Sequence, residues 1–511
     1  MEINMKQYVM GIDNGGSSVK AALFDLKGME IAVAASNYSG MVRTDQGFTE
    51  RDGSQVWKEN CNVIREVLQT AGIEGQQVIG IGVTGYGNGL HLVDAQGQDT
   101  YPHIVSTDSR AKDDVEQAYK SGVSEQIYRQ TFQSTWAAQP LMLLKWMKAH
   151  RPDVVAKTKY FLNIKDYIRL RLTDVFCMER TDASADGFLN IESGEPDPKV
   201  FELLGIAELQ QLVPEIRPSA EICGHVTEQA AKETGLAQGT PVAGGMIDIE
   251  ACAFASGLLQ QGELAVVTGT WSLVEYLSPA PIDDKELFIN ALSYLPEYYL
   301  VVEGSSTSAG NYDWVMEHMF SDWVKAVGGK GNFYQLCEQI LEKISPEECS
   351  CIFLPYLYAS NTNPLSRGAF FNLNSYHTRE HLIRSVQEGI VFSGRYHLEK
   401  LQKYQKDFSL VHMSGGITNS AMWTQMMCDV LQIPIEVVQG KQQGAKGAAM
   451  CAGVAAGAFA DITEAVRQMT VVEKRYLPDP SRAEVYRRKY ERYKAAAKAV
   501  NVFTESIKNI G

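Results

Sequence analysis

The stretch DNGGSSVK, residues 13–20, decides how this chain folds, because it joins two apolar runs at residues 8–12 and 19–24. Two apolar runs joined by a short turn of Gly and Ser predict a β-hairpin. Small residues in such a turn let backbone N–H groups and hydroxyls approach phosphate oxygens, and Asp13 at the strand end can hold a hydrated Mg²⁺. The turn matches neither a P-loop nor a dinucleotide-binding glycine pattern. A hairpin without a ligand is the alternative for this segment alone.

A second hairpin with the same pattern follows about 250 residues later. Residues 263–276 read ELAVVTGTWSLVEY, which places a turn with Gly269 and Thr270 between two apolar runs. The turn is a second candidate phosphate site, and an ordinary loop is its alternative. The repeat predicts a duplicated domain with a boundary near Ala255. A chain of 511 residues is long enough for two large domains with a ligand cleft between them.

Strand and helix patterns alternate along both halves, which predicts an α/β class. Residues 54–72 carry apolar side chains at helical spacing and end at a glycine, and residues 78–85, VIGIGVTG, read as a strand. Residues 377–401 predict a long amphipathic helix. Residues 481–503 predict a charged surface helix on which a stripe of tyrosines is a packing face, with Tyr486, Tyr490 and Tyr493 as its members.

Charge and composition exclude several classes of protein. The formal net charge of -14 comes from acidic residues spread along the chain, which argues against nucleic acid as a partner. No stretch holds 18 consecutive apolar residues, and the N-terminus lacks a secretory apolar region, so we expect a cytoplasmic protein that is not bound to a membrane. The nine cysteines show no zinc-site spacing and are expected to be reduced, mostly buried thiols.

A carboxylate follows two glycines in residues 244–251, GGMIDIEA, at a predicted junction of strand and helix. Phosphoryl transfer needs positioned phosphates and one carboxylate that accepts the hydroxyl proton. Asp248 fits that role, and the alternative is a helix N-cap.

Residues 414–420, SGGITNS, lie between a predicted strand and the predicted helix 421–432. Their glycine pair can admit a flat base against the backbone, and a polar residue in the first helical turn can bond its edge. A turn without a ligand is the alternative here as well.

Taken together, the four segments in this order and spacing strongly resemble the FGGY family of carbohydrate kinases, within the superfamily of actin, hexokinase and Hsp70. The resemblance covers nearly the whole chain and includes further motifs, namely GFTERD at 47–52 with Trp57, TDAS at 181–184, LPY at 354–356, Arg367-Gly368 and 377–389. It implies an α/β fold of two ribonuclease H-like (actin-like ATPase) domains with a cleft between them. The implied ranges are 1–254 for the N-terminal domain with the sugar and phosphate site, 255–475 for the nucleotide-binding domain, and 476–511 for a helical tail packed on the core.

The resemblance also implies an activity and a set of site residues. The enzyme would transfer the γ-phosphoryl group of ATP to a hydroxyl of a small ketose, with Asp248 as the base and Asp13 near Mg²⁺. Family positions around the phosphates and the nucleotide correspond to Gly15, Gly16, Ser17, Ser18, Lys20, Gly269, Thr270, Gly415, Gly416 and Ser420. Substrate positions correspond to Tyr86, Asn88, Asp108 and Asp248.

Within the family the likeness is to the L-xylulose kinase and xylulokinase-like subgroup, on GNG at 87–89, STDSR at 106–110, AEICG at 220–224 and TGTW at 268–271. The substrate alternatives are D-xylulose, ribulose, 3-keto-L-gulonate, erythritol and glycerol. Gln442 stands where many relatives have glutamate, and Gly16 replaces a usual threonine.

Two further readings of the same fold compete with a kinase. One is an ATP-driven conformational machine of the actin or Hsp70 type, and Asn88, Asp248 and the lack of a peptide-binding domain argue against it. The other is a sugar sensor without catalysis, which the presence of both Asp13 and Asp248 argues against. Family members are often dimers, so a homodimer is expected.

Overall fold

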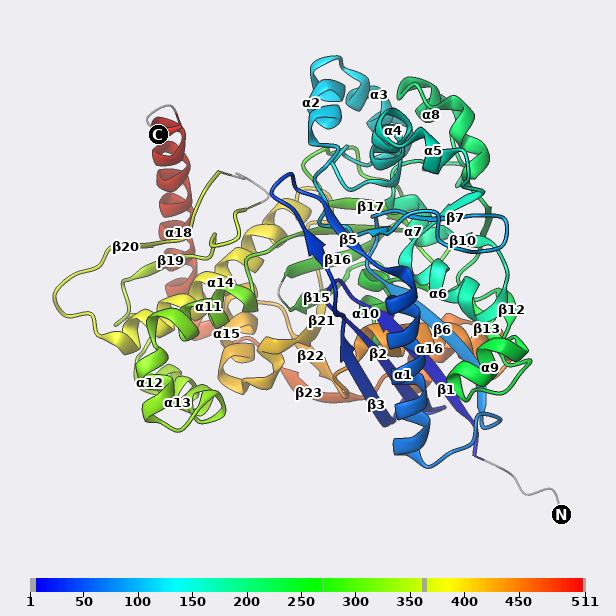
Figure 1. Ribbon diagram of the computed structural model, residues 1–511. Coiled ribbons are helices and arrows are strands. Elements are labelled where there is room, and N and C mark those ends of the chain that lie inside the picture. The colour runs from blue at the N-terminus through cyan, green and yellow to red at the C-terminus, as the bar shows by residue number, and fades with distance from the viewer. Residues whose placement is uncertain (1–5, 270, 361–364, 509–511) are drawn as a thin grey trace. The chain divides into compact units, whose positions relative to one another are not determined.

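The computed structural model describes residues 6–269, 271–360 and 365–508, and it confirms the α/β class (Figure 1). The chain forms two compact units, each assembled from separated segments. Unit 1 comprises residues 1–259, 277–301 and 442–471, and unit 2 comprises residues 260–276, 302–441 and 472–511. The domain ranges inferred from the family resemblance stay a prediction. Within the described residues, no helix is both long and apolar enough to cross a membrane.

The main sheet of unit 1 contains the predicted first hairpin. Its strand order is β12-β13-β6-β1-β2-β3, and β14 also pairs with β6. The pairings β1–β6 and β13–β6 are parallel, whereas β1–β2, β2–β3 and β12–β13 are antiparallel. The bounds are β1 (Tyr8–Asn14), β2 (Ser18–Asp25), β3 (Glu30–Asn37), β6 (Val78–Gly85), β12 (Ile222–His225), β13 (Pro241–Ala243) and β14 (Met246–Ile247).

Helices and short strands surround this sheet. The predicted helix near residue 54 is confirmed, since α1 begins after the N-cap Asp52 and ends at Gly72, whose φ of 63° is left-handed. The other helical elements of unit 1 are α2 (Lys112–Lys120), α3 (Val123–Thr131), α4 (Pro140–His150), α5 (Pro152–Val155), α6 (Ile164–Thr173), α7 (Arg180–Ala185), α8 (Pro198–Leu203), the 3-10 helix η1 (Ala207–Leu212), α9 (Glu228–Thr234), α10 (Asp248–Ser256), α16 (Gln443–Ala455) and α17 (Ile462–Met469), beside α1 (Gly53–Ala71). The short strands are β4 (Val42–Arg43), β5 (Thr49–Arg51), β7 (His91–Val93), β8 (His103–Ile104), β9 (Tyr160–Leu162), β10 (Cys177–Glu179), β11 (Glu215–Arg217) and β17 (Ile289–Leu292).

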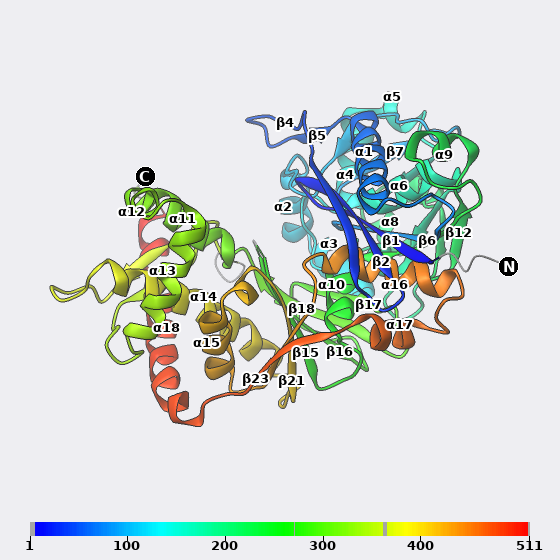
Figure 2. The same cartoon turned by 90° about the horizontal axis from the view of Figure 1, so that it is seen from below.

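Helix α16 packs against β1 and β6, although it comes from the far end of the sequence (Figures 1 and 2). Glycines on the strands make this close approach possible. A Cβ on Gly11 would lie 1.7 Å from the Ala445 carbonyl oxygen, and one on Gly82 would lie 1.9 Å from that of Ala448. Because side chains alternate along a strand, Asp13 lies on the same face of β1 as Gly11 and points toward the start of α16.

The sheet of unit 2 contains the second predicted hairpin, and its order there is β18-β16-β15-β21-β22-β23. The antiparallel β15–β16 pairing confirms the hairpin, and β15 runs parallel to β21. The strands of unit 2 are β15 (Glu263–Thr268), β16 (Ser272–Ser278), β18 (Tyr299–Ser305), β19 (Ile352–Leu354), β20 (Ala369–Phe371), β21 (Leu410–Gly415), β22 (Ile435–Val438) and β23 (Val472–Tyr476). Its helices are α11 (Ala309–Met319), α12 (Ser321–Ala326), α13 (Lys330–Lys343), α14 (Arg379–Leu401), the 3-10 helix η2 (Gly416–Asn419), α15 (Ala421–Leu431) and α18 (Pro480–Ile507).

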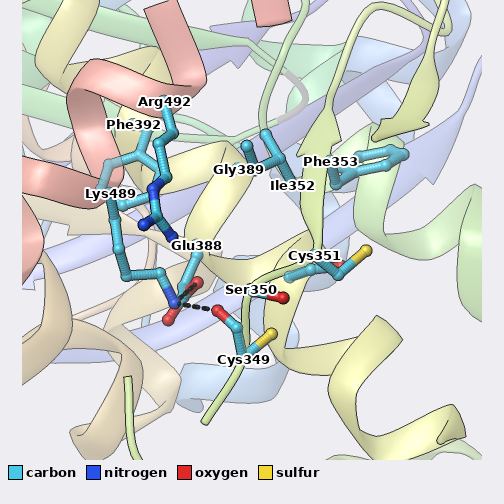
Figure 3. Close-up of a pocket in the computed structure, with 11 residues that line it drawn as sticks. Cys349, Ser350, Cys351, Ile352, Phe353, Glu388, Gly389, Phe392, Lys489 and Arg492 are labelled. Carbon is cyan, nitrogen blue, oxygen red and sulfur yellow. Dashed lines mark hydrogen bonds and ion pairs between the residues drawn. The ribbon is translucent and has the colours of Figure 1, made fainter. Parts of the chain in front are cut away.

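The C-terminal helix α18 is anchored in unit 2 by a buried lysine (Figure 3). Lys489 Nζ donates to the carbonyls of Pro346 and Cys349 at 2.7 Å each, and it pairs with Glu388 Oε2 at 2.6 Å. The cavity beside these groups measures about 10 Å³, which holds one water molecule at most. The cavity is therefore too small for a ligand, and the Lys489 contacts beside it serve to anchor α18. The tyrosine stripe of this helix is buried as predicted.

Candidate functional site

Three strand ends of unit 1 meet at one edge of its sheet. Asp13 of β1 and Met246 of β14 both pair with Thr84 of the central strand β6. All three strands run in the same direction, so their carboxyl ends lie side by side. Asp248 follows β14 directly as the first residue of α10. The fold therefore brings Asp13 and Asp248 to the same edge, where ligands of open α/β sheets bind.

The Asp13 carboxylate lies close to the backbone of α16, and Lys20 is the nearby basic residue. A Cβ on Gly444, at the start of α16, would lie 2.9 Å from Asp13 Oδ2, so only glycine leaves room for the carboxylate. Lys20 is the register partner of Asp13 across the hairpin. Burial raises the pKa of Asp13, and the positive charge of Lys20 opposes the rise. A cation held at this carboxylate would offset the cost of burying its charge.

Asp248 is a carboxyl group whose pKa is moved toward neutrality. Burial raises its pKa to about 7, with the negative charge of Asp13 as the second cause and backbone N–H groups of the first turn opposing both. The N-cap of α10 is Ile247, so Asp248 does not have the N-cap role that was the alternative interpretation. A carboxylate with this pKa is suited to accept a proton near neutral pH.

The turn between β1 and β2 is held at its base and open at its tip. Gly15 N donates to Ser18 O at 2.9 Å, which closes the turn. Gly16 and Ser17 are exposed, and a Cβ on Gly16 would meet no heavy atom of the described chain within 4 Å. The glycine that replaces the usual threonine is thus not required sterically. The predicted phosphate turn presents free backbone at its tip.

Arg51 supports this turn from behind and was not predicted as a site residue. Its Nη2 donates to Gly16 O at 2.7 Å, and its guanidinium lies 4.1 Å from the centre of the Tyr38 ring. Tyr38 in turn donates to Asn14 Oδ1, which also accepts from Asn60 Nδ2 at 2.9 Å. The sequence signal for Arg51 is its position in the GFTERD motif at residues 47–52. The structure shows that this charged residue is fully buried.

Tyr86 and Asn88 follow β6 at the same sheet edge. The Tyr86 hydroxyl lies 3.4 Å from His91 Nε2, and the negative charge of Asp182 acts on it. Asn88 has a left-handed φ of 65°, and its side-chain Oδ1 is buried without a hydrogen-bond partner among the residues that the structure describes. A buried amide oxygen without a partner is an unusual feature that a bound hydroxyl group would satisfy.

The Asp108 carboxylate is fully engaged by neighbouring groups of unit 1. Oδ2 accepts from Thr49 N at 2.6 Å and from Arg110 Nη2 at 2.8 Å, and Oδ1 accepts from Arg110 N and Nε at 2.9 Å each. Arg110 also reaches Glu50 at 2.7 Å. These bonds fix the loop after β8 and occupy both oxygens. Its role in substrate binding stays a prediction.

In unit 2 the two predicted nucleotide turns lie next to each other. Thr268 at the end of β15 pairs in register with Gly415 at the end of β21, so Gly269 and Gly416 follow adjacent strand ends. Thr268 Oγ1 donates to Ser414 O at 2.9 Å, and Ala309 N donates to Gly269 O at 3.0 Å. Gly415 has a φ of 99°, and a Cβ there would lie 2.7 Å from the Thr268 backbone. Thr270 lies outside the described residues.

Ser420 has a structural partner in the turn that follows. It is the N-cap of α15, and its hydroxyl accepts from Trp423 N at 3.1 Å. Gly415 and Gly416 are exposed, which leaves their backbone accessible.

Gln442, which stands where many relatives have glutamate, belongs to unit 1. It occupies the N-cap position of α16, two residues before the Gly444 that contacts Asp13.

In the described ranges no group of three or more His, Cys, Asp or Glu side chains is arranged to hold a metal ion. Mg²⁺ is commonly bound by one or two carboxylates together with substrate phosphates, so a single carboxylate such as Asp13 remains compatible with such a site.

Comparisons with known proteins cover almost the entire chain. Residues 8–255 match the N-terminal domain of the FGGY family of carbohydrate kinases, and residues 264–456 match its C-terminal domain. The chain is 33% identical over 505 residues to the L-xylulose/3-keto-L-gulonate kinase of Escherichia coli K12, with 99% of each chain covered. It is 33% identical over 495 residues to the probable L-xylulose kinase of Pasteurella multocida, with 96% of this chain and 99% of that one covered. The crystal structure of xylulose kinase from Rhodospirillum rubrum superposes with a TM-score of 0.86 at 26% identity, covering 98% of this chain and 100% of that one.

Proposed function

The chain belongs to the FGGY family of carbohydrate kinases and is an ATP-dependent sugar phosphotransferase, and from this premise we propose that its acceptor is a small ketose, with the pentulose L-xylulose as first candidate. Two relatives with one third of their residues identical are named for L-xylulose, and one of them also for 3-keto-L-gulonate. The observation that carries the proposal is that Asp13 lies at the same sheet edge as Asp248, whose pKa is raised to about 7.

Asp248 is the general base in this proposal. Its carboxylate takes the proton of the acceptor hydroxyl as the hydroxyl oxygen bonds to the γ-phosphorus of ATP and the bond to the β-phosphate oxygen breaks, which releases ADP. An ordinary aspartate is a weak base at pH 7. A pKa of about 7 makes Asp248 a stronger base that is still half ionised at neutral pH.

Asp13 is the proposed ligand of Mg²⁺ in this site. Its burial beside a second carboxylate fits a cation, because among the described residues Lys20 alone supplies a positive charge that opposes the rise of its pKa. When bound, the ion supplies positive charge that neutralises the phosphate oxygens. The turn residues Gly15, Gly16, Ser17 and Ser18, with Lys20, are proposed to receive the phosphates through backbone N–H groups, hydroxyls and the ammonium.

The nucleotide side of the proposal rests on unit 2. Exposed backbone at Gly415 and Gly416 would accommodate the adenosine, and Gly269 with Thr270 would contact phosphates. The Ser420 hydroxyl already caps α15, so we propose that it acts by holding the turn in shape.

Asn88 is proposed to contact the sugar through its amide oxygen, which has no hydrogen-bond partner among the described residues. Tyr86, two residues earlier in the chain, is proposed as a second substrate contact. A neutral amide suits the hydroxyl and carbonyl groups of a ketose. Asp108 is proposed to hold the loop after β8 in position at the acceptor site, because both of its carboxylate oxygens are already bonded within that region. The family domains 1–254, 255–475 and 476–511, a cytoplasmic location and a homodimer complete the proposal.

A coupled ADP-release assay with MgATP tests the function. The acceptor panel is L-xylulose, D-xylulose, L- and D-ribulose, L-lyxose, 3-keto-L-gulonate, erythritol and glycerol. We expect ADP release to rise sharply with one ketose, because the correct substrate completes the site. Strong stimulation by glycerol or erythritol alone would contradict the ketose. ADP release that ignores every sugar would instead support an ATP-driven conformational machine.

A further inference from the structure

The loop after β6 holds Asn88 in an unusual backbone conformation. Asn88 has a φ of 65° and Gly89 a φ of 80°, so two consecutive residues are left-handed. Asparagine is among the few residues other than glycine that adopt this conformation, and it still needs support from its surroundings. Gly89 is held by the bond from its N–H to Ala138 O at 2.9 Å. The conformation aims the Asn88 amide, so whatever holds its backbone also sets where that amide points.

The Asn88 backbone is held by a carboxylate that the sequence did not suggest. Asn88 N donates to Asp186 Oδ1 at 3.2 Å, and Asn163 Nδ2 donates to Asp186 Oδ2 at 2.8 Å. Asp186 is the C-cap residue of α7, and Asn163 directly precedes α6, so two helix ends support the loop. All three residues are buried, with 1% of Asp186 and none of Asn163 exposed.

Asn88 Oδ1 has no partner in the part of the chain that the structure describes, whereas its backbone N–H is bound. This combination separates two functions in one residue: the backbone is fixed to the protein, and the side chain is left for a ligand. A buried acceptor of this kind costs free energy unless a donor completes it. Sugar hydroxyl groups are donors of the required type.

We propose that Asp186, anchored by Asn163, is a positioning residue for the acceptor sugar: it holds the Asn88 backbone in its left-handed conformation and so fixes the amide that contacts a sugar hydroxyl. The inference rests on the proposed function, because it assumes that Asn88 faces the acceptor. Asp186 does not touch the sugar. Its effect appears in sugar affinity through Asn88, and it should leave the nucleotide site unchanged.

The chain offers an informative pair of substitutions at this position. Asp186→Ala removes both acceptors and leaves the Asn88 N–H buried without a partner. Asp186→Asn keeps Oδ1 for Asn88 N–H. Its new amide group takes the place of Oδ2 and faces Asn163 Nδ2, so the Asn163 amide must flip to offer its Oδ1, which is buried and has no partner among the described residues. The asparagine variant should therefore restore the loop without the charge.

The assay is sugar-dependent ADP release by the full chain with L-xylulose at pH 8, where Asp186 and Asp248, whose pKa values burial raises to about 7, are both largely ionised. We expect Asp186→Ala to raise KM for the sugar about tenfold or more, with KM for ATP and sugar-free ATP hydrolysis unchanged. Asp186→Asn should return KM for the sugar to within about threefold of the parent value. Asn163→Ala should raise it to an intermediate degree.

Thr234→Ala is the matched control, because it removes a buried hydrogen bond of 2.6 Å to Ala230 O in α9, elsewhere in unit 1. It should lower Tm without moving KM for the sugar. If Asp186→Ala lowers Tm in the same way and leaves KM unchanged, Asp186 is only structural and the proposal is wrong. If Asp186→Ala does not fold, Asn163→Ala with an unchanged KM overturns it equally. A parent enzyme without any sugar-dependent ADP release would refute the proposed function itself.

Discussion

Burial and, after it, the carboxylate of Asp13 raise the pKa of Asp248, although Asp13 and Asp248 are far apart in the chain. The relationship arises because β1 and β14 flank the same central strand and both pair with Thr84. Placing two carboxyl groups at one buried edge costs free energy, since like charges in a partly desolvated site repel each other. Such an arrangement is typical of sites where a cation and a proton acceptor act together.

The pH dependence of turnover follows from the pKa of Asp248. A base with a pKa of about 7 is protonated at lower pH and cannot accept the hydroxyl proton. kcat/KM for the sugar should therefore fall as pH decreases below about 7, approaching tenfold per pH unit. A pH–rate profile from pH 5 to 9, with excess coupling enzyme at every pH, measures this. A flat profile down to pH 5.5 would show that Asp248 is not the titrating base.

Replacing Asp13 should weaken Mg²⁺ binding and so raise the Mg²⁺ requirement of the reaction. We expect Asp13→Asn to raise the Mg²⁺ concentration for half-maximal activity by on the order of tenfold or more, because the amide lacks the charge that attracts the ion. Mg²⁺ titrations at fixed ATP measure this. Asp45→Asn, which changes an exposed aspartate of the neighbouring hairpin, is the control. An unchanged Mg²⁺ requirement in Asp13→Asn would remove Asp13 from the metal site.

Two adjacent glycines of unit 2 should differ in their response to alanine. At Gly415 a Cβ would lie 2.7 Å from the Thr268 backbone, and the φ of 99° is unfavourable for any side chain. At Gly416 the nearest atom would be 3.6 Å away. Gly415→Ala should cost on the order of 1–3 kcal/mol and lower Tm by several degrees, whereas Gly416→Ala should leave Tm nearly unchanged. Equal melting temperatures in thermal unfolding of the two variants would contradict the conformation of this turn.

Glu250 should make the protein less stable as pH rises. It is fully buried in α10, accepts from Ser293 Oγ at 2.7 Å and from Tyr294 N at 2.8 Å, and burial raises its pKa to about 8. Between its unfolded pKa near 4.5 and its folded pKa of about 8, the native state binds a proton that the unfolded chain has lost. The free energy of unfolding therefore decreases across that window, by on the order of a few kcal/mol from this group.

Glu250→Gln removes the titrating group and keeps an acceptor for Ser293 and Tyr294. Urea unfolding at pH 5 and pH 8.5 should show a smaller loss of stability for this variant than for the parent. Because other buried carboxyl groups titrate in both proteins, the difference between the two curves isolates Glu250. Parallel curves would mean that folding does not raise the pKa of Glu250, so that the group is already ionised in the folded protein well below pH 8.

Much of the local structure could be predicted from the sequence because its signals are local. The turn at Gly15 lies between two apolar runs, and that pattern predicts the hairpin, whereas the register that pairs Asp13 with Lys20 came from the structure. Gly416, which follows the strand β21, could be assigned to a turn because it comes directly after an apolar run. Family resemblance added what periodicity cannot provide, namely the relation between segments hundreds of residues apart.

Other features depend on contacts that no local pattern encodes. The packing of α16 against Gly11 and Gly82 joins segments from opposite ends of the chain, and small residues alone do not identify their partner. The bond between Asp186 and Asn88 N likewise depends on where α7 ends in space. The capping role of Ser420 is different, because a serine before a helix is a readable N-cap signal and the nucleotide interpretation took precedence.

The most direct test of the account is phosphoryl transfer to L-xylulose by Asp248→Asn compared with the parent enzyme. The variant removes the proton acceptor and keeps the size of the side chain. We predict that the variant binds L-xylulose with an affinity close to that of the parent by calorimetry, while kcat falls by about 10²–10⁴-fold. Transfer within a few-fold of the parent rate would show that Asp248 is not the base and would contradict the central claim.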